Sequence, residues 1–176
     1  MTDLRDLDGR AAQGWGGSAP DGVHVNVFTA RRGSATAAAM TSAFASPSQG
    51  FAPILVCTGQ SQQTYQTLQP PTILLPKSAP ATEFAQTLIS GAVQVGTARA
   101  VLGAVAAGRV AANSEHLIFV SVWVDPQAQD ETAVRDAAHV AVTRALAEAI
   151  QGRDAREVAE LVARRDSVTH PFYNGK

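Results

Sequence analysis

The stretch Gly22-Val23-His24-Val25-Asn26-Val27-Phe28-Thr29 decides how this chain folds. Successive side chains of a strand point to opposite faces, so its three valines form one apolar row, whereas His24, Asn26 and Phe28 share the other face. The valine row predicts contact with a core. An imidazole beside an amide destabilises a fold unless both groups find hydrogen-bond partners or face a wet cavity. Two interpretations stay open: a site built on a rigid strand, or a half-solvated edge strand with polar outer residues.

Length and charge narrow the class of protein. The chain has 176 residues, enough for one full core and short for two domains. Hydrophobic residues make up 45% of it and charged residues 16%, and 14 Lys and Arg against 15 Asp and Glu give a net charge of −1. The chain has no excess of positive charge with which to bind nucleic acid or an anionic membrane, so a small, neutral partner is expected.

The chain also carries signals about compartment. It starts without a basic region followed by an apolar run, and no uncharged apolar segment approaches the roughly 18 residues needed to span a bilayer. Cys57 is the only cysteine, which excludes an internal disulfide and a cysteine-rich metal cluster. Its apolar neighbours favour an inert core thiol over a reactive one. We expect a cytoplasmic protein that does not act on a membrane.

Glycine and proline divide the chain into elements. Residues 1–21 are expected to form a flexible arm because Gly14, Gly16, Gly17 and Pro20 fall within it, and residues 22–176 to form one domain. A helix begins after Ser34 and ends before proline 47. Further strands are expected at 51–57, 72–77 and 117–124, and further helices at 81–108, about 129–150 and 153–165.

These elements predict an α+β fold, a two-layer sandwich of βαββαβαα order with a four-stranded sheet covered by helices on one face. The strand at 51–57 is nearly all apolar, as expected of a strand buried on both faces. The long helix is rich in small residues, which would let it lie close to the sheet. It also carries Ser90, Gln94 and Thr97 on one face, either a solvent-facing stripe or part of a site.

Familiar chemical motifs are missing from the sequence. We find no phosphate-binding loop, nucleophile elbow or dinucleotide fingerprint. The four histidines, His24, His116, His139 and His170, lie far apart in the chain, so no metal site is predicted.

An ordered set of separate segments resembles the formaldehyde-activating enzyme family, as a divergent homologue. The resemblance covers roughly residues 22–173, and no single motif carries it. The matching segments are Val23-His24-Val25-Asn26, Gly50-Phe51 with Ile54-Leu55, Pro76-Lys77, Gly91-Ala92-Val93-Gln94-Val95-Gly96, the strand 117–124, and Thr169-His170-Pro171-Phe172.

The resemblance implies roles for particular positions. His24 falls where the family has its general acid, Leu55 on the strand that lines the pterin pocket, and Lys77 and Gln94 where a lysine and a glutamine contact the pterin. For these last three, the alternatives are plain core for Leu55, a solvated strand end for Lys77 and the polar stripe for Gln94.

Two pocket positions depart from the family pattern. Asn26 stands where an aspartate is typical and Ala79 where a threonine is typical. The first difference removes a negative charge two residues from His24, and the second removes a hydroxyl. Both positions are still expected to line the substrate pocket.

The resemblance also implies a fold similar to the ribosomal-protein second-domain-like fold and an activity. That activity is the condensation of formaldehyde with tetrahydromethanopterin, or a related tetrahydropterin, to the methylene-tetrahydropterin and water. The enzyme would be a carbon–nitrogen lyase with the pterin as co-substrate, with no tightly bound cofactor and no metal, assembled as a homopentamer. Two alternatives stay open: a non-catalytic pterin- or formaldehyde-binding carrier or sensor, and an assembly subunit.

Overall fold

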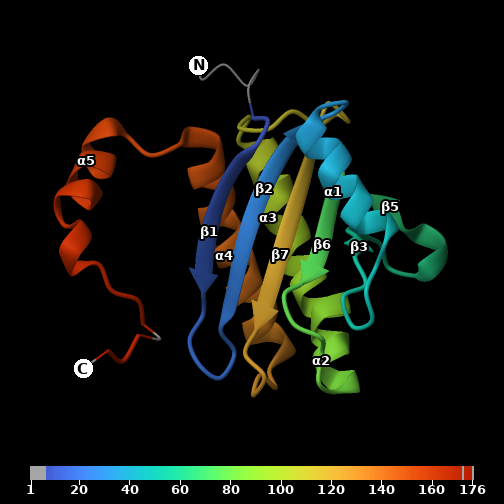
Figure 1. Cartoon of the computed structure of the whole chain (residues 1–176). Helices are drawn as coiled ribbons and strands as arrows, with labels where there is room; N and C mark the ends of the chain where they lie inside the picture. Colours follow the sequence, from blue (N-terminus) through green and yellow to red (C-terminus); the bar gives the residue numbers. More distant parts are fainter. Residues whose placement is uncertain (1–6, 172, 176) are drawn as a thin grey trace.

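A mixed five-stranded sheet forms the centre of the protein (Figure 1). The computed structural model describes residues 7–171 and 173–175. Strand β6 runs parallel to β7, and the other neighbouring strands are antiparallel. In spatial order, the strands are β1 (Arg10–Gly16), β2 (Val23–Arg31), β7 (His116–Val124), β6 (Thr72–Pro76) and β3 (Ile54–Leu55).

The helices and minor elements complete the two layers. The helices are α1 (Ala35–Ala45), α2 (Glu83–Leu88), a π-helical turn η2 (Ile89–Val93), α3 (Gln94–Ala106), α4 (Glu131–Gln151) and α5 (Ala155–Ala163). A small two-stranded sheet pairs β4 (Cys57–Thr58) with β5 (Gln66–Thr67), and two 3₁₀ turns cover Gln62–Thr64 and Arg165–Ser167.

The main core lies between the sheet and the layer of α3 and α4. Val23, Val25 and Val27 are fully buried, as the alternation in the sequence predicts. They pair with Val124, Val122 and Val120 on β7, which continue the apolar row across the sheet. The strands expected around residues 22–29, 72–77 and 117–124 are confirmed, and so is the stop at proline 76.

Strand β1 corrects the expectation of a flexible arm at residues 1–21, which is wrong for residues 10–16. β1 pairs along its whole length with β2. Its glycines are needed for close packing: a Cβ on Gly14 would lie 2.1 Å from the carbonyl oxygen of Ala141, and one on Gly16 would lie 2.0 Å from that of Ala137. Helix α4 therefore rests directly on the β1 backbone. Residues 1–6 lie outside the described residues.

The strand expected at 51–57 is also different. Only Ile54 and Leu55 join the main sheet, at its edge beside β6, and Cys57 belongs to the small second sheet. Because β3 lies at an edge, Leu55 is 41% exposed, and the expectation of a strand buried on both faces is wrong. With β1 added, the sheet has five strands instead of the four expected.

Helix α1 lies on the opposite face of the sheet from α3 and α4 (Figure 1). Ser34 caps it by accepting a hydrogen bond from the Ala37 backbone N–H at 3.0 Å, as the sequence predicts. An apolar cavity of about 220 Å³ separates Met40 and Phe44 on α1 from Phe28 and Phe119 on the sheet. Helices α3 and α4 thus cover the face of the sheet that carries the valine row. Helix α1 covers one end of the other face, and the end of that face with His24 stays open.

The long helix expected at 81–108 is interrupted by the π-helical turn η2. By length and composition, the stretch Glu83–Ala106 could cross a membrane, but 56% of its most apolar window is buried, as in a core helix. Its small residues serve contact with α4: a Cβ on Gly96 would lie 2.3 Å from the carbonyl oxygen of Arg135. The helix therefore packs closely on its neighbouring helix as well as covering the sheet.

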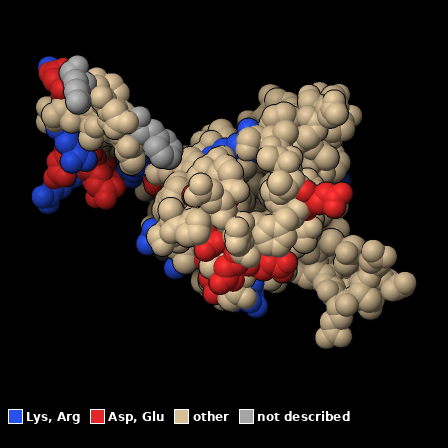
Figure 2. Space-filling model, turned by 90° about the horizontal axis from the view of Figure 1, so that it is seen from below, with Lys and Arg blue, Asp and Glu red and all other residues tan. Residues whose placement is uncertain are grey.

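Helix α5 projects away from the body of the protein (Figure 1), and no residue in it is buried. Figure 2 shows the same segment from below, with blue and red side chains gathered on it. Asp154 caps the helix through the Glu157 backbone N–H. The helix forms as the sequence predicts, yet its apolar side has no partner among the described residues of the chain.

Candidate active site

The open face of the sheet places His24 in a row of aromatic side chains. His24 pairs with Trp15 on β1 and with Trp123 on β7. The Trp15 ring centroid lies 6.1 Å from that of His24 and 5.8 Å from that of Trp123, with both pairs of rings tilted. His24 thus lies between the two tryptophans in the register of the sheet, while the two indole rings contact each other beside its partly buried imidazole.

Lys77 completes the centre of this site. The residue follows β6, and its backbone N–H donates to the Val122 carbonyl at 2.7 Å, which holds the start of the loop against β7. Its Nζ atom lies 2.7 Å from Nδ1 of His24. Nε2 of His24 lies 3.1 Å from Oε1 of Gln13. The geometry assigns the Nδ1 atom as acceptor from Lys77 and the Nε2–H group as donor to Gln13.

The surroundings shift both titratable groups in the same direction. Burial lowers the pKa of Lys77 to about 8. Burial also lowers the pKa of His24, and the positive charges of Lys77 and then His170 lower it further. Since two adjacent cations repel, the hydrogen-bonded pair holds one proton at neutral pH, mostly on Lys77.

His170 brings the C-terminal segment into the electrostatics of the site. Its charge acts on His24, although 146 residues separate them in the sequence. None of the causes that shift the pKa of His24 or Lys77 is a carboxylate. Within the described residues, the site is therefore a cationic cluster in which the His24–Lys77 pair holds one proton beside the second imidazole, that of His170. The last residue of the segment that resembles the family, Phe172, lies outside the described residues.

Asn26 lies on the same face, one pair further along β2. It pairs with Gln13 on β1 and with Ser121 on β7, and is partly buried. A carboxylate at this position would face the cationic cluster, whereas the amide leaves the cluster without a neutralising charge.

The remaining predicted site residues do not join His24 within the described part of this chain. No hydrogen bond links Leu55, Ala79 or Gln94 to His24 or Lys77 there. Leu55 lies exposed on the edge strand β3, so the interpretation as plain core is wrong. Ala79 is exposed in the loop after β6, against Gly50, where a Cβ on the glycine would meet the Ala79 Cβ at 2.5 Å.

Gln94 ties the π-helical turn to the small sheet. Its Oε1 atom accepts from the Cys57 backbone N–H at 2.9 Å, and its Nε2 atom donates to the Ser90 carbonyl at 2.7 Å. The Cys57 sulfur is 3.5 Å from the same Oε1 atom, so the thiol is partly buried and hydrogen-bonded. Thr97 is fully buried, so the interpretation of Ser90, Gln94 and Thr97 as a solvent-facing stripe is wrong.

Sequence reasoning missed Trp15 and Gln13 as site residues because it placed them in a flexible arm. The signal available in the sequence was the alternation along β1, where Gln13 and Trp15 share one face and Gly14 and Gly16 share the other. Trp123 lies near the end of a strand that was correctly predicted. Its pairing with His24 depends on the register between β2 and β7, which the sequence does not show.

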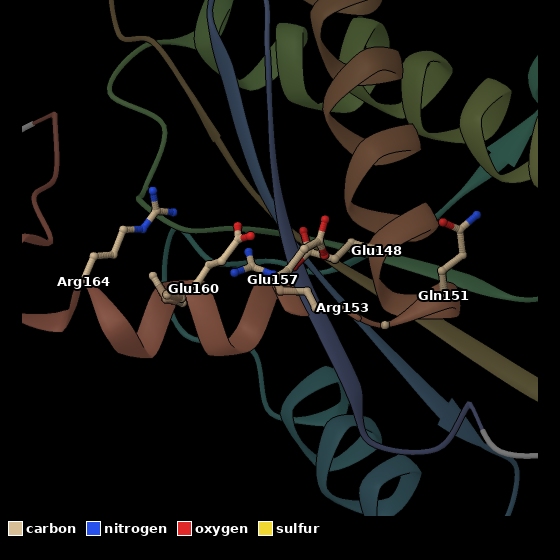
Figure 3. Close-up of a pocket in the computed structure, with 8 residues that line it drawn as sticks. Glu148, Gln151, Arg153, Glu157, Glu160 and Arg164 are labelled. Atoms are coloured by element: carbon tan, nitrogen blue, oxygen red, sulfur yellow. The ribbon is translucent and has the colours of Figure 1, made fainter. Parts of the chain in front are cut away.

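Two cavities differ sharply in their chemistry. One of about 260 Å³ begins directly after Lys77, at the carboxyl ends of β6 and β7, and is lined by Ala79, Phe84 and Ile89 among others. The other, of about 550 Å³, separates the end of α4 from α5 and is lined by charged side chains such as Glu148 and Arg153 (Figure 3). Neither His24 nor Lys77 lines the first cavity. Its β7 residues, Val122 and Val124, belong to the valine row on the opposite face of the sheet from His24, so the pair faces the open side of the sheet and not this cavity.

The described residues contain no cluster of three or more His, Cys, Asp or Glu side chains that could hold a metal ion. Fold and site together define an α+β protein with an imidazole–amine pair set between tryptophans on an open sheet face. That pair can move a proton to or from a small substrate.

The sequence comparisons agree with this class. The family described as formaldehyde-activating enzyme (Fae) matches residues 14–173. A 5,6,7,8-tetrahydromethanopterin hydro-lyase of Methanosarcina barkeri (strain Fusaro / DSM 804) is 31% identical over 158 residues, covering 89% of this chain and 85% of the relative. The chain belongs to the formaldehyde-activating enzyme family. The match begins at residue 14, so it includes the last three residues of β1.

Proposed function

We propose that this protein is a lyase that condenses formaldehyde with tetrahydromethanopterin, or a related tetrahydropterin, to give the methylene-tetrahydropterin and water. Membership of the family supports the reaction. The observation that carries the assignment within this structure is the 2.7 Å contact between Lys77 Nζ and His24 Nδ1 on the open face of the sheet.

The difficult step of this reaction is the loss of a hydroxyl group. A secondary amine of the pterin adds to formaldehyde to form a carbinolamine, and hydroxide leaves poorly without a proton. His24 donates its Nε2 proton to that oxygen, and Lys77 replaces the proton through Nδ1. Neutral water leaves, the positive charge remains on the pterin as an iminium ion, and the second pterin nitrogen closes on its carbon and returns a proton to the pair. A positioned acid of this kind typically contributes roughly 10²–10⁴ in rate.

The substrate-binding residues follow from the same proposal. Lys77 and Asn26 lie on the open face with His24, where amine and amide groups can bind polar edges of a pterin ring. Ala79 lies in the loop that follows Lys77 and lines the cavity of about 260 Å³ between that loop and α2. We place Leu55 and Gln94 in the pterin site by family resemblance, and in this chain they lie on the edge strand and the π-helical turn.

Purified protein mixed with tetrahydromethanopterin and formaldehyde tests the proposal. The absorbance change should exceed the spontaneous rate, and His24→Ala should return it to that rate. Saturable pterin binding without acceleration would indicate a carrier or sensor instead of an enzyme. The missing negative charge at Asn26 is the physical reason that this outcome is considered. If the protein neither binds the pterin nor accelerates the condensation, the remaining interpretation is an assembly subunit.

We also propose that the chain works as a homo-oligomer, a homopentamer by family resemblance. Helix α5 offers an apolar stripe of Val158, Leu161 and Val162, which are 46%, 39% and 58% exposed. The Gln94 amide is bonded to Cys57 and Ser90 and not to the His24–Lys77 pair, and Leu55 lies exposed on the edge strand, so a neighbouring copy is the natural source of these residues for the site. Apolar stripes of this kind cover one another in obligate assemblies.

A further inference from the structure

The sequence contains very few primary amines. Among 14 basic Lys and Arg residues, only Lys77 and Lys176 are lysines, and Lys176 lies outside the described residues. The lysine in the described fold is therefore the residue that touches His24. Its proton can pass to Nδ1, which leaves a neutral amine 2.7 Å from an imidazolium ion.

We propose that the Nζ amine of Lys77 captures formaldehyde covalently and hands its carbon to the pterin. The inference rests on the proposed function and replaces one step of it, the direct attack of the pterin amine on free formaldehyde, by capture on Lys77. Family resemblance gives Lys77 only a binding contact, whereas the geometry pairs it with a proton donor at hydrogen-bond distance.

The steps balance without an added oxidant or reductant. The lone pair of Nζ attacks the formaldehyde carbon, the C=O electron pair moves to oxygen, and a proton moves from nitrogen to oxygen to give a carbinolamine. His24 imidazolium then protonates the hydroxyl, the C–O bond breaks, water leaves, and an iminium ion remains on Lys77. A pterin nitrogen attacks that carbon and its proton returns to His24. The second pterin nitrogen then displaces Nζ, which takes up the last proton.

The electrostatics of the site favour this role. Lys77 has a pKa of about 8 because of burial, so about one molecule in ten carries a neutral amine at pH 7. The same fraction for an ordinary lysine is smaller by roughly 200-fold. Among the described residues, no carboxylate is a cause of the pKa shift of either partner, so no negative charge there offsets the burial that favours the neutral amine.

Reductive trapping tests the proposal. The full-length protein is incubated at pH 7 with ¹³C-formaldehyde and cyanoborohydride, without pterin, and methylation of each lysine is followed by peptide mass spectrometry. We expect Lys77 to be labelled at least about 10-fold faster than Lys176, with a rate that falls above pH 8, where the pair loses the proton that His24 needs to expel water. Labelling of the two lysines at equal rates would overturn the proposal.

A chase distinguishes capture from transfer. Protein loaded with ¹³C-formaldehyde, freed of excess reagent and mixed with tetrahydromethanopterin before the reductant, should lose its label at Lys77 and yield ¹³C-methylene-pterin. Label that remains on Lys77 would mean a side reaction and would overturn the transfer step.

Two variants complete the test. Lys77→Arg keeps a cation and a hydrogen-bond donor beside His24 but forms no iminium ion, so the rate should fall to the spontaneous level. Lys176→Arg should leave the acceleration unchanged. If the natural protein accelerates the condensation and Lys77→Arg does too, or Lys77 is not trapped, this inference fails while the proposed function stands. If the natural protein gives no acceleration but traps formaldehyde at Lys77 that the pterin does not remove, the proposed function and the transfer step both fail.

Discussion

Lys77 and His24, 53 residues apart in sequence, are joined by a 2.7 Å hydrogen bond and hold a single proton between them at neutral pH. Because of this hydrogen bond, the pair can act as a general acid and as a general base at the same position. A solvated lysine with an ordinary pKa would be too weak an acid for that task near neutrality.

His24→Gln should reduce the acceleration to the spontaneous rate while the fold stays intact. His24 lies on the open face and only partly buried, so its removal leaves the valine core untouched. Initial rates measure the first effect, and far-UV circular dichroism with a melting curve measures the second. Loss of secondary structure together with activity would make His24 a structural residue.

The pH–rate profile should show an alkaline limb near pH 8. Lys77 has a pKa of about 8, and above that pH the pair loses the proton that the leaving hydroxyl requires. Initial rates corrected for the spontaneous reaction, measured from pH 6 to 10, give the position of the limb. A rate that stays constant up to pH 10 would contradict a role for this proton.

Asn26→Asp should move that limb to higher pH. A carboxylate two residues from His24 on the same face would favour the charged forms of His24 and Lys77 and raise the pKa of each. Asn26→Gln is the matched control, because it keeps an amide and adds no charge. If both variants move the limb equally, a change of shape and not of charge is responsible. Combining Asn26→Asp with Ala79→Thr should give additive effects, because the two positions lie on separate elements.

Gln94→Ala should lower the free energy of unfolding by about 1–2 kcal/mol, since it leaves the partly buried Cys57 N–H without its partner. Gln86→Ala, which removes an exposed hydrogen bond to Ser90, is the control and should change stability little. Denaturant unfolding measures stability, and calorimetry measures pterin affinity. Weaker pterin binding at unchanged stability would place the amide directly on the ligand.

Gly14→Ala should destabilise the protein by about 1–3 kcal/mol, because the new Cβ meets the α4 backbone at Ala141. Gly103→Ala is the control: a Cβ there meets nothing within 4 Å, and alanine favours a helix by up to about 1 kcal/mol. Melting temperatures distinguish the two. A Gly14→Ala protein as stable as the natural one would show that β1 can move away from α4.

Leu161→Asp should reduce the oligomer to smaller species if α5 docks on another copy, because it places a charge in the apolar stripe. Arg156→Gln is the control on the charged side, where Arg156 is 86% exposed in its pair with Glu160. Light scattering after size-exclusion chromatography gives the mass. An unchanged mass for Leu161→Asp would remove α5 from the interface.

Local patterns predicted most of the fold. The alternation in β2, the Ser34 cap of α1 and the proline end of β6 each act over a few residues, so the sequence shows them directly. Strand β1 was not predicted, because glycines in a short stretch of sequence indicate flexibility. In the fold these glycines allow close contact with α4, more than 120 residues away in the sequence. The predicted His24 and Lys77 do meet, but the bond between them depends on the order β2-β7-β6, which periodicity does not contain.

The π-helical turn Ile89–Val93 sets a limit on how this segment can change in length. Each residue of an α-helix turns the chain by about 100°, and the π-helical turn already holds one residue more than an α-helix would, so inserting a further residue there would rotate everything after it relative to α2. Gln94 would move away from Cys57, and a residue with a side chain would replace Gly96 against the backbone of α4. Insertions in related chains should therefore fall before Glu83 or after Ala106, whereas the loss of one residue inside the turn could convert it to an α-helical turn with Gln94 and Gly96 kept in place.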